Sequence, residues 1–170
     1  MIEHTVIGIM KKLKMSACER DVHLMAKPFS QTQASLTIET TIEIDSAIER
    51  SRNIVDGTVY TKDGTTVCSY KEAAENGEIS NIVKINQNAV TIIRNGSVAM
   101  RQPFIIACET NGSYHTPFGS LATKALTKDI QFEWDRKREV GSLLLAYDLW
   151  MQENHTGFFT VKIHMEGVRK

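Results

Sequence analysis

The sequence predicts an all-β fold: a single antiparallel up-and-down barrel of about ten strands, after an N-terminal extension. Apolar and polar residues alternate along several stretches, and this alternation is the pattern of a half-buried strand. Turn-forming pairs such as Asp63-Gly64 and Asn95-Gly96 separate these stretches. No convincing long helix follows residue 34. Joining the first and last strands removes the edges that an open sheet exposes, which favours a barrel.

Residues 1–34 differ from the rest, because they show no sustained alternation. We expect an N-terminal extension, helical or flexible, with a marginal helix over Leu13–Met25 that ends before Pro28. Two alternatives remain open here: an arm that docks across the barrel, or a native chain that starts at Met25 and lacks residues 1–24. The barrel domain itself is expected over residues 35–167.

The first strand carries apolar residues at alternate positions from Leu36 to Ile44, with polar residues between them. The following segment, Asp45–Asn53, breaks this alternation, and we expect a helical turn or a loop there.

The pair Asp63-Gly64 predicts a hairpin with a two-residue loop. This register places Val59 opposite Cys68. The face that carries Val59, Cys68 and Tyr70 is then expected to look into the core, with Glu72 at its rim.

The stretch Asn88–Phe104 has the clearest hairpin signal, because apolar-rich runs flank Asn95-Gly96. A two-residue loop pairs Arg94 with Ser97. The uncharged face is the expected core side, and it holds Thr91, Ile93, Val98, Met100 and Phe104. The other face holds Val90, Ile92, Ala99, Arg94 and Arg101.

Two interpretations of the charged face remain open. In the first, the face lies outside, and the arginine stems cover Val90 and Ile92 while their charged heads stay in water. In the second, the face looks into a cavity, where Arg94 anchors an anionic ligand through a bidentate contact. A buried arginine requires a partner, and the candidates are Glu72 or the ligand itself.

The second half of the chain continues the pattern of strands and turns. Asn111-Gly112 predicts a turn, and Leu121–Trp134 predicts a long strand with a bend in its middle. Asp135–Glu139 is expected to be a solvated turn. Ser142–Met151 predicts a strand, and a turn over Asn154–Gly157 leads into the final strand.

The charge balance limits the classes of partner. Twenty basic and twenty acidic residues cancel, so the net charge is zero and the pI is near 7. Nucleic acid is therefore not an expected partner, because its binding depends on clustered Lys and Arg. No apolar stretch predicts a membrane helix, and Val6–Met10 is too short for a signal peptide. We expect a cytoplasmic protein.

Residue types that carry chemistry are scattered along the chain. The three cysteines, Cys18, Cys68 and Cys108, form no CxxC motif, and we expect Cys68 and Cys108 to pack as small apolar residues. Neither a Gly-rich phosphate loop, a GxSxG elbow nor an HExxH motif occurs. We therefore expect no catalytic residues, no metal and no cofactor, and hence no enzyme.

The runs DGTVYTKDGTTVCSYKE, IRNGSVAMRQPF, YHTPFG and LLLAYDLWM occur in this order. With them the chain resembles the YwiB-like family of uncharacterised bacterial proteins, over roughly Ser35–Gly167. The resemblance implies a calycin-type β-barrel, the broad class that includes lipocalins and fatty-acid-binding proteins. It also favours Met25 as the start of the chain, and it implies no activity.

A barrel of roughly eight to ten strands can hold one small ligand, so we expect a small apolar or amphipathic molecule in the barrel. The residues expected to line its site are Arg94, Tyr70, Glu72, Tyr114, Thr116 and Tyr147. The alternative is a protein-interaction or structural module that uses its outer surface and binds no ligand. Both a monomer and a homodimer are compatible with the sequence.

Overall fold

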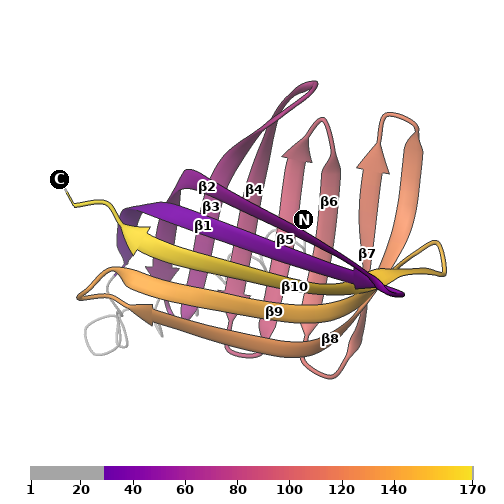
Figure 1. The fold of residues 1–170 in the computed structure, drawn as a ribbon. Coiled ribbons are helices and arrows are strands. Elements are labelled where there is room, and N and C mark those ends of the chain that lie inside the picture. The colour runs from indigo at the N-terminus through magenta and orange to yellow at the C-terminus, as the bar shows by residue number, and fades with distance from the viewer. Residues whose placement is uncertain (1–28, 170) are drawn as a thin grey trace, which may run out of the picture.

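Residues 29–169 are described by the computed structural model, and they form ten β-strands (Figure 1). The strands are β1 (Ser30–Ile44), β2 (Ala47–Lys62), β3 (Thr65–Ala74), β4 (Gly77–Asn86), β5 (Ala89–Gly96), β6 (Ala99–Ile105), β7 (Glu109–Thr116), β8 (Gly119–Asp135), β9 (Val140–Met151) and β10 (Asn154–Gly167). Each strand pairs antiparallel with its neighbours in the chain, and β1 also pairs with β10. The predicted up-and-down barrel is thereby confirmed.

The barrel has two layers whose strands run across each other (Figure 1). Strands β8, β9, β10 and β1 form one layer, and β3 to β7 form the other. The first strand begins at Ser30, five residues before its predicted start at residue 35. The marginal helix over Leu13–Met25, the arm and the alternative start at Met25 all lie outside the described residues.

The prediction of a helical turn or loop over Asp45–Asn53 is wrong. After the turn residue Asp45, whose φ is 52°, β2 begins at Ala47 and pairs with β1 along its whole length. Among the described strands, β1 is the only neighbour of this half of β2, and the β2 side chains from Ala47 to Ile54 are exposed on both faces. Because neither face is buried, no alternation was required, and the sequence pattern gave no strand signal.

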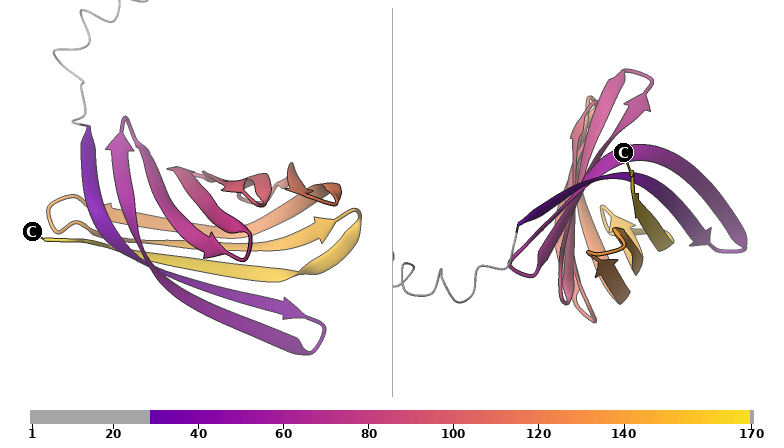
Figure 2. Two further views of the ribbon diagram at one scale, coloured as in Figure 1. Left: turned by 90° about the horizontal axis from the view of Figure 1, so that it is seen from above. Right: turned by 90° about the vertical axis from the view of Figure 1, so that its left-hand side faces the viewer.

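The barrel is split between β2 and β3. Their pairing runs only from Gly57–Tyr70 to Lys62–Thr65, so residues 47–56 of β2 and 71–74 of β3 have unpaired edges there. Figure 2 shows the tip of the β1–β2 hairpin lying apart from the β3–β4 hairpin. Ile48 and Ile54 near this open edge are 52% and 64% exposed.

The interior of the barrel is filled by side chains. Those that are less than 2% exposed include Phe104, Leu36, Ile85, Leu143, Leu145, Val59, Val83 and Val90. The Tyr147 ring packs between two others, with centroids 4.4 Å from Phe104 and 5.3 Å from Phe159. Alternate residues of each strand supply this core, as the sequence pattern indicated.

The hairpin at Asp63-Gly64 has the predicted register. Both turn residues have positive φ, 50° and 78°, as a type I′ turn requires. Val59 pairs with Cys68, and both side chains are buried. The predicted core face is therefore confirmed for this hairpin.

The predicted register at Asn95-Gly96 is wrong. Arg94 pairs with Met100 rather than Ser97, because Asn95 and Gly96 remain in β5 and pair with β4. Gly96 allows this approach, since a Cβ there would lie 2.2 Å from the backbone oxygen of Glu78.

The longer loop shifts the pairing of β5 and β6 by three residues, an odd number, which exchanges the faces of β5. The inward face therefore carries Val90, Ile92 and Arg94 rather than Thr91 and Ile93. The arginine predicted to lie on one of two faces is on the side that looks into the barrel.

The predicted turn at Asn111-Gly112 is also wrong, because both residues lie within β7. The glycine makes room for Gln102, whose buried amide bonds to the backbone oxygens of Pro103 and Thr110 at 2.9 and 3.3 Å. A Cβ on Gly112 would lie 2.3 Å from Gln102 Oε1. Strands β6 and β7 pair at only three positions, so this side chain supplies bonds that the ladder lacks.

The remaining elements agree with the sequence, with one shift. The expected bend in β8 is a register shift between Thr127 and Asp129, and the expected solvated turn follows β8 over residues 136–139. The last turn comes earlier than expected, at Gln152-Glu153, where both residues have positive φ. Backbone N–H groups of the solvated turn bond to the Asp135 carboxylate and lower its pKa.

Replacement of Gly112 by alanine tests the account of the β6–β7 contact. We expect Gly112→Ala to lower the free energy of unfolding by about 1–3 kcal/mol, because the added methyl group displaces Gln102 from its bonds. Urea unfolding measures this change, and Asn111→Ala, at the neighbouring exposed position, is the matched control. Equal stability of the two variants would contradict the account.

Candidate functional site

One row of inward-facing residues crosses β3 to β7 near the end of these strands. Cross-strand pairing joins its members in the order Tyr70, Asn81, Arg94, Met100 and Tyr114. Paired residues of an antiparallel sheet share a face, so all five look into the same end of the barrel. We call these five residues the mouth row.

Arg94 forms a hydrogen-bonded network with two neighbours at this mouth. Its Nη2 lies 3.2 Å from Glu72 Oε2, and its Nε donates to Asn81 Oδ1 at 3.0 Å. Asn81 Nδ2 in turn donates to Glu72 Oε2 at 3.0 Å. The partner that an inward arginine requires is therefore Glu72, one of the two candidates named from the sequence.

The network leaves one nitrogen and one carboxylate oxygen without a bond. Within residues 29–169, neither Arg94 Nη1 nor Glu72 Oε1 has a hydrogen-bond partner. The two side chains are 32% and 21% exposed, so they lie between the core and solvent. Asn81 is 2% exposed and uses both ends of its amide, which holds the other two in place.

Two tyrosines lie close enough to Arg94 for its charge to act on them. Burial raises the pKa of the Tyr147 hydroxyl, and the Arg94 charge opposes that rise. Burial, followed by the Glu72 charge, raises the pKa of the Tyr70 hydroxyl, with Arg94 again opposing. Neither hydroxyl bonds to any residue of the described part of the chain. Both remain uncharged at neutral pH, where they act as donors and acceptors.

The structure brings four of the six predicted site residues together: Arg94, Glu72, Tyr70 and Tyr147. Tyr114 belongs to the mouth row, but Met100 separates it from Arg94.

Thr116 is the last residue of β7, beside the β7–β8 turn, where its hydroxyl donates to the Gly119 backbone oxygen and accepts from the Phe118 backbone N–H. Asn81 was not predicted as a site residue from the sequence. The pattern that could have indicated it is a polar residue at an inward position between Ile79 and Val83.

A hollow of about 430 Å³ lies at the split between β2 and β3, next to this network. It is lined by Asn53, Ile54, Val55, Lys71, Glu72, Ala73, Ile79 and Arg94. Its lining is mainly polar, with Glu72 and Arg94 providing hydrogen-bonding groups, and only a minor part of it is apolar.

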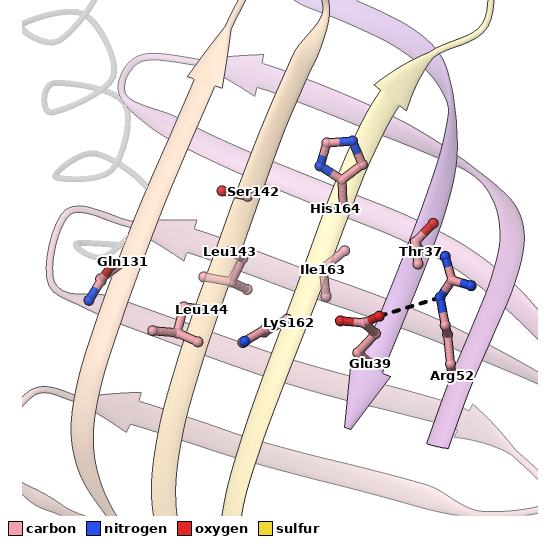
Figure 3. Close-up of a pocket in the computed structure, with 10 residues that line it drawn as sticks. All are labelled: Thr37, Glu39, Arg52, Gln131, Ser142, Leu143, Leu144, Lys162, Ile163 and His164. Atoms are coloured by element: carbon pink, nitrogen blue, oxygen red, sulfur yellow. Dashed lines mark ion pairs between the residues drawn. The ribbon is translucent and has the colours of Figure 1, made fainter. Parts of the chain in front are cut away.

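A second hollow, of about 510 Å³, lies on the outer surface (Figure 3). Its polar lining includes Lys162 and His164, which are outward residues of β10 on either side of the inward Ile163. Glu39 and Arg52 form an ion pair there at 3.3 Å, with side chains 51% and 63% exposed. Such exposed ion pairs contribute little free energy, so this hollow is the weaker candidate for a binding site.

Other reactive groups do not assemble into a site. Residues 29–169 hold no group of three or more His, Cys, Asp or Glu side chains placed to bind a metal ion. The same residues include no helix that could cross a membrane. Cys68 is buried as predicted, whereas Cys108 is exposed in the turn after β6, so its predicted packing is wrong.

The comparisons with known proteins agree with this fold. The family model described as "Domain of unknown function (DUF1934)" matches residues 36–163. The chain is 30% identical over 137 residues to the uncharacterised beta-barrel protein YwiB of Bacillus subtilis (strain 168), covering 81% of this chain and 95% of that protein. The crystal structure of the ywiB protein from Bacillus subtilis matches with a TM-score of 0.74 and 31% identity, covering 82% of this chain and 94% of that one. The resemblance inferred from the sequence is confirmed, and the calycin and lipocalin labels fit the barrel.

The buried thiol predicts a pH dependence of stability. Burial raises the pKa of Cys68 from its ordinary 9.0 to about 12, so the unfolded thiol ionises first as the pH rises. The contribution of the buried thiol to the free energy of unfolding is complete below about pH 9. It falls as the pH rises towards 12, by at most about 1.4 kcal/mol per pH unit. We expect Cys68→Ala to flatten the alkaline fall of the unfolding free energy, measured by urea unfolding. Cys108→Ala, at an exposed cysteine, should keep the wild-type slope, and equal slopes for both variants would refute the assignment.

Proposed function

The chain belongs to the DUF1934 family of β-barrel proteins, and we propose that it binds a small amphipathic molecule at the mouth row. The polar end of this molecule contacts Arg94 and Glu72 in the mainly polar hollow between β2 and β3, and its apolar part packs against Ile54 and Val55 at the edge of that hollow. We propose the cytoplasm as the place of this activity, because free thiols such as those of Cys68 and Cys108 are typical of a reducing compartment.

The main support is an incomplete set of hydrogen bonds at an inward position. The atoms concerned are reachable from the mouth, because within residues 29–169 only Thr127 Oγ1 is both fully buried and without a hydrogen-bond partner. Tyr147 is only 7% exposed, yet its hydroxyl lacks a partner within residues 29–169, and Arg94 and Glu72 each keep an atom unbonded. A bound polar group supplies the missing bonds.

The packing of the core places the ligand at the mouth rather than at the centre of the barrel. The rings of Phe104, Tyr147 and Phe159 occupy the interior, so an enclosed ligand would have to displace them. The hollow at the split is already open and needs no such rearrangement. This revises the expected location inside the barrel and keeps the expected amphipathic character.

Titration with hexanamide, followed by NMR of the isotope-labelled full chain, tests this proposal. We expect saturable shifts of the Arg94 Nε–H signal and of the backbone amides of Val55 and Glu72. The amides of Leu144 and Lys162 in the outer hollow serve as the internal control and should not move. Shifts confined to the outer hollow, or none at the solubility limit, would rule the proposal out.

The open edge of β2 favours a second candidate function, an interaction through the outer surface. Unpaired strand edges bind other strands, and natural proteins usually protect them with proline, bulges or inward charges. The unpaired residues 47–56 include no proline but four charged residues, and Ile48 and Ile54 are exposed beside the edge. A two-fold antiparallel pairing about Ser51 would place Ile48 of one copy opposite Ile54 of the other, so we propose a homodimer.

Sedimentation velocity of the full chain tests the dimer. We expect the wild type to dimerise and the double variant Ile48→Lys, Ile54→Lys to be monomeric, since lysine on an edge blocks pairing. Ile105→Lys, at a 43% exposed position on another strand, is the matched control and should still dimerise. A wild type that stays monomeric at every concentration would exclude this function.

A further inference from the structure

We propose that the ligand's polar end is an uncharged group with both a hydrogen-bond donor and an acceptor, such as a primary amide. This inference rests on the proposed function, because it names the chemical class that the mouth row selects. It follows from how Arg94, Glu72 and Asn81 use their bonding atoms.

The two charged groups of the site cancel each other. Arg94 and Glu72 carry opposite charges and are in contact at 3.2 Å, so the pair is neutral as a unit. The rim is balanced in the same way, because Lys71 Nζ lies 2.7 Å from Glu78 Oε1. A carboxylate or ammonium group that enters this hollow would be partly desolvated and would have no counter-charge. Such a position is unfavourable for an ion.

Part of the Arg94 guanidinium is already bonded within the protein. Carboxylates bind best to two parallel N–H groups of a guanidinium. In this structure the Nε side is occupied, since Nε donates to Asn81 and Nη2 contacts Glu72. The Nε–Nη2 side of the guanidinium is therefore already used by an amide and a carboxylate of the protein itself, and Nη1 is the nitrogen left for a ligand.

The unbonded atoms of Arg94 and Glu72 match the bonding groups of a primary amide. Arg94 Nη1 offers only donors, and Glu72 Oε1 offers only an acceptor. A primary amide presents a carbonyl oxygen to the first and an N–H to the second. The hydroxyls of Tyr70 and Tyr147 add neutral groups that donate or accept, so they place no charge requirement on the ligand.

A series of hexyl compounds that differ only in the head group tests this inference. The probes are hexanamide, hexanol, hexanoate and hexylammonium, titrated into the full chain with the Arg94 Nε–H signal as readout. We expect the wild type to bind hexanamide most tightly, and both ions about tenfold or more weakly, the factor that corresponds to about 1.4 kcal/mol. Tightest binding of hexanoate or hexylammonium would overturn the inference and leave the proposed function standing. Failure of all four probes would remove the proposed function, and the inference with it.

Two variants each remove one charge of the site. Glu72→Gln leaves Arg94 without its counter-charge, so we expect hexanoate to become the preferred probe. Arg94→Gln leaves Glu72 unbalanced, and hexylammonium should then be preferred, followed through the Glu72 and Val55 amides.

The controls are Glu109→Gln and Lys124→Gln, which change an exposed ion pair of 3.5 Å on β7 and β8. They should keep the wild-type preference. Unchanged preference in both site variants would refute the inference. If either variant fails to fold, the wild-type ranking of the four probes decides alone.

Discussion

An arginine that faces the inside of a packed barrel has to be paired, because an unpaired charge in that position is strongly unfavourable. In this barrel Glu72 and Asn81, from two neighbouring strands, meet that requirement for Arg94. The three side chains lie where the apolar core gives way to solvent. They neutralise one another, and they leave one nitrogen and one carboxylate oxygen without a bond at the mouth.

The split between β2 and β3 determines how this network meets solvent. If the two strands paired along their full length, β2 would cover the side of β3 on which Glu72 lies. Their pairing stops at Gly57 and Tyr70, and the hollow opens just beyond. The same divergence leaves the outer half of β2 with an unpaired edge. A site for a small molecule and an edge for another strand therefore arise from one feature of the sheet.

The sequence predicted the fold well where one face of a strand is buried and the turn is tight. The register at Asp63-Gly64 followed from the turn residues, because two positive φ values are needed there. The strand over residues 47–53 was missed, because neither of its faces is buried. Asn111-Gly112 resembled a turn, whereas Gly112 is required by the distant Gln102, and no local pattern reports such a contact.

The candidate site was predicted in part. Arg94 and its partner Glu72 were identified together, because an inward arginine needs a carboxylate and Glu72 lay at the rim of a core face. The face of Arg94 could not be assigned from the sequence, because it depends on a loop whose length Gly96 and β4 set together. Asn81 was missed, since its role appears only once three strands lie side by side.

The central claim is that Arg94 and Glu72 act as one neutral unit, and a double-mutant cycle of Arg94→Leu and Glu72→Leu measures it most directly. Each single variant leaves a partly buried charge without its partner, and the double variant removes both charges. We therefore expect the double variant to be more stable than the sum of the single effects indicates, by about 1–3 kcal/mol in urea unfolding. Additive effects, with no coupling between the two positions, would contradict the claim.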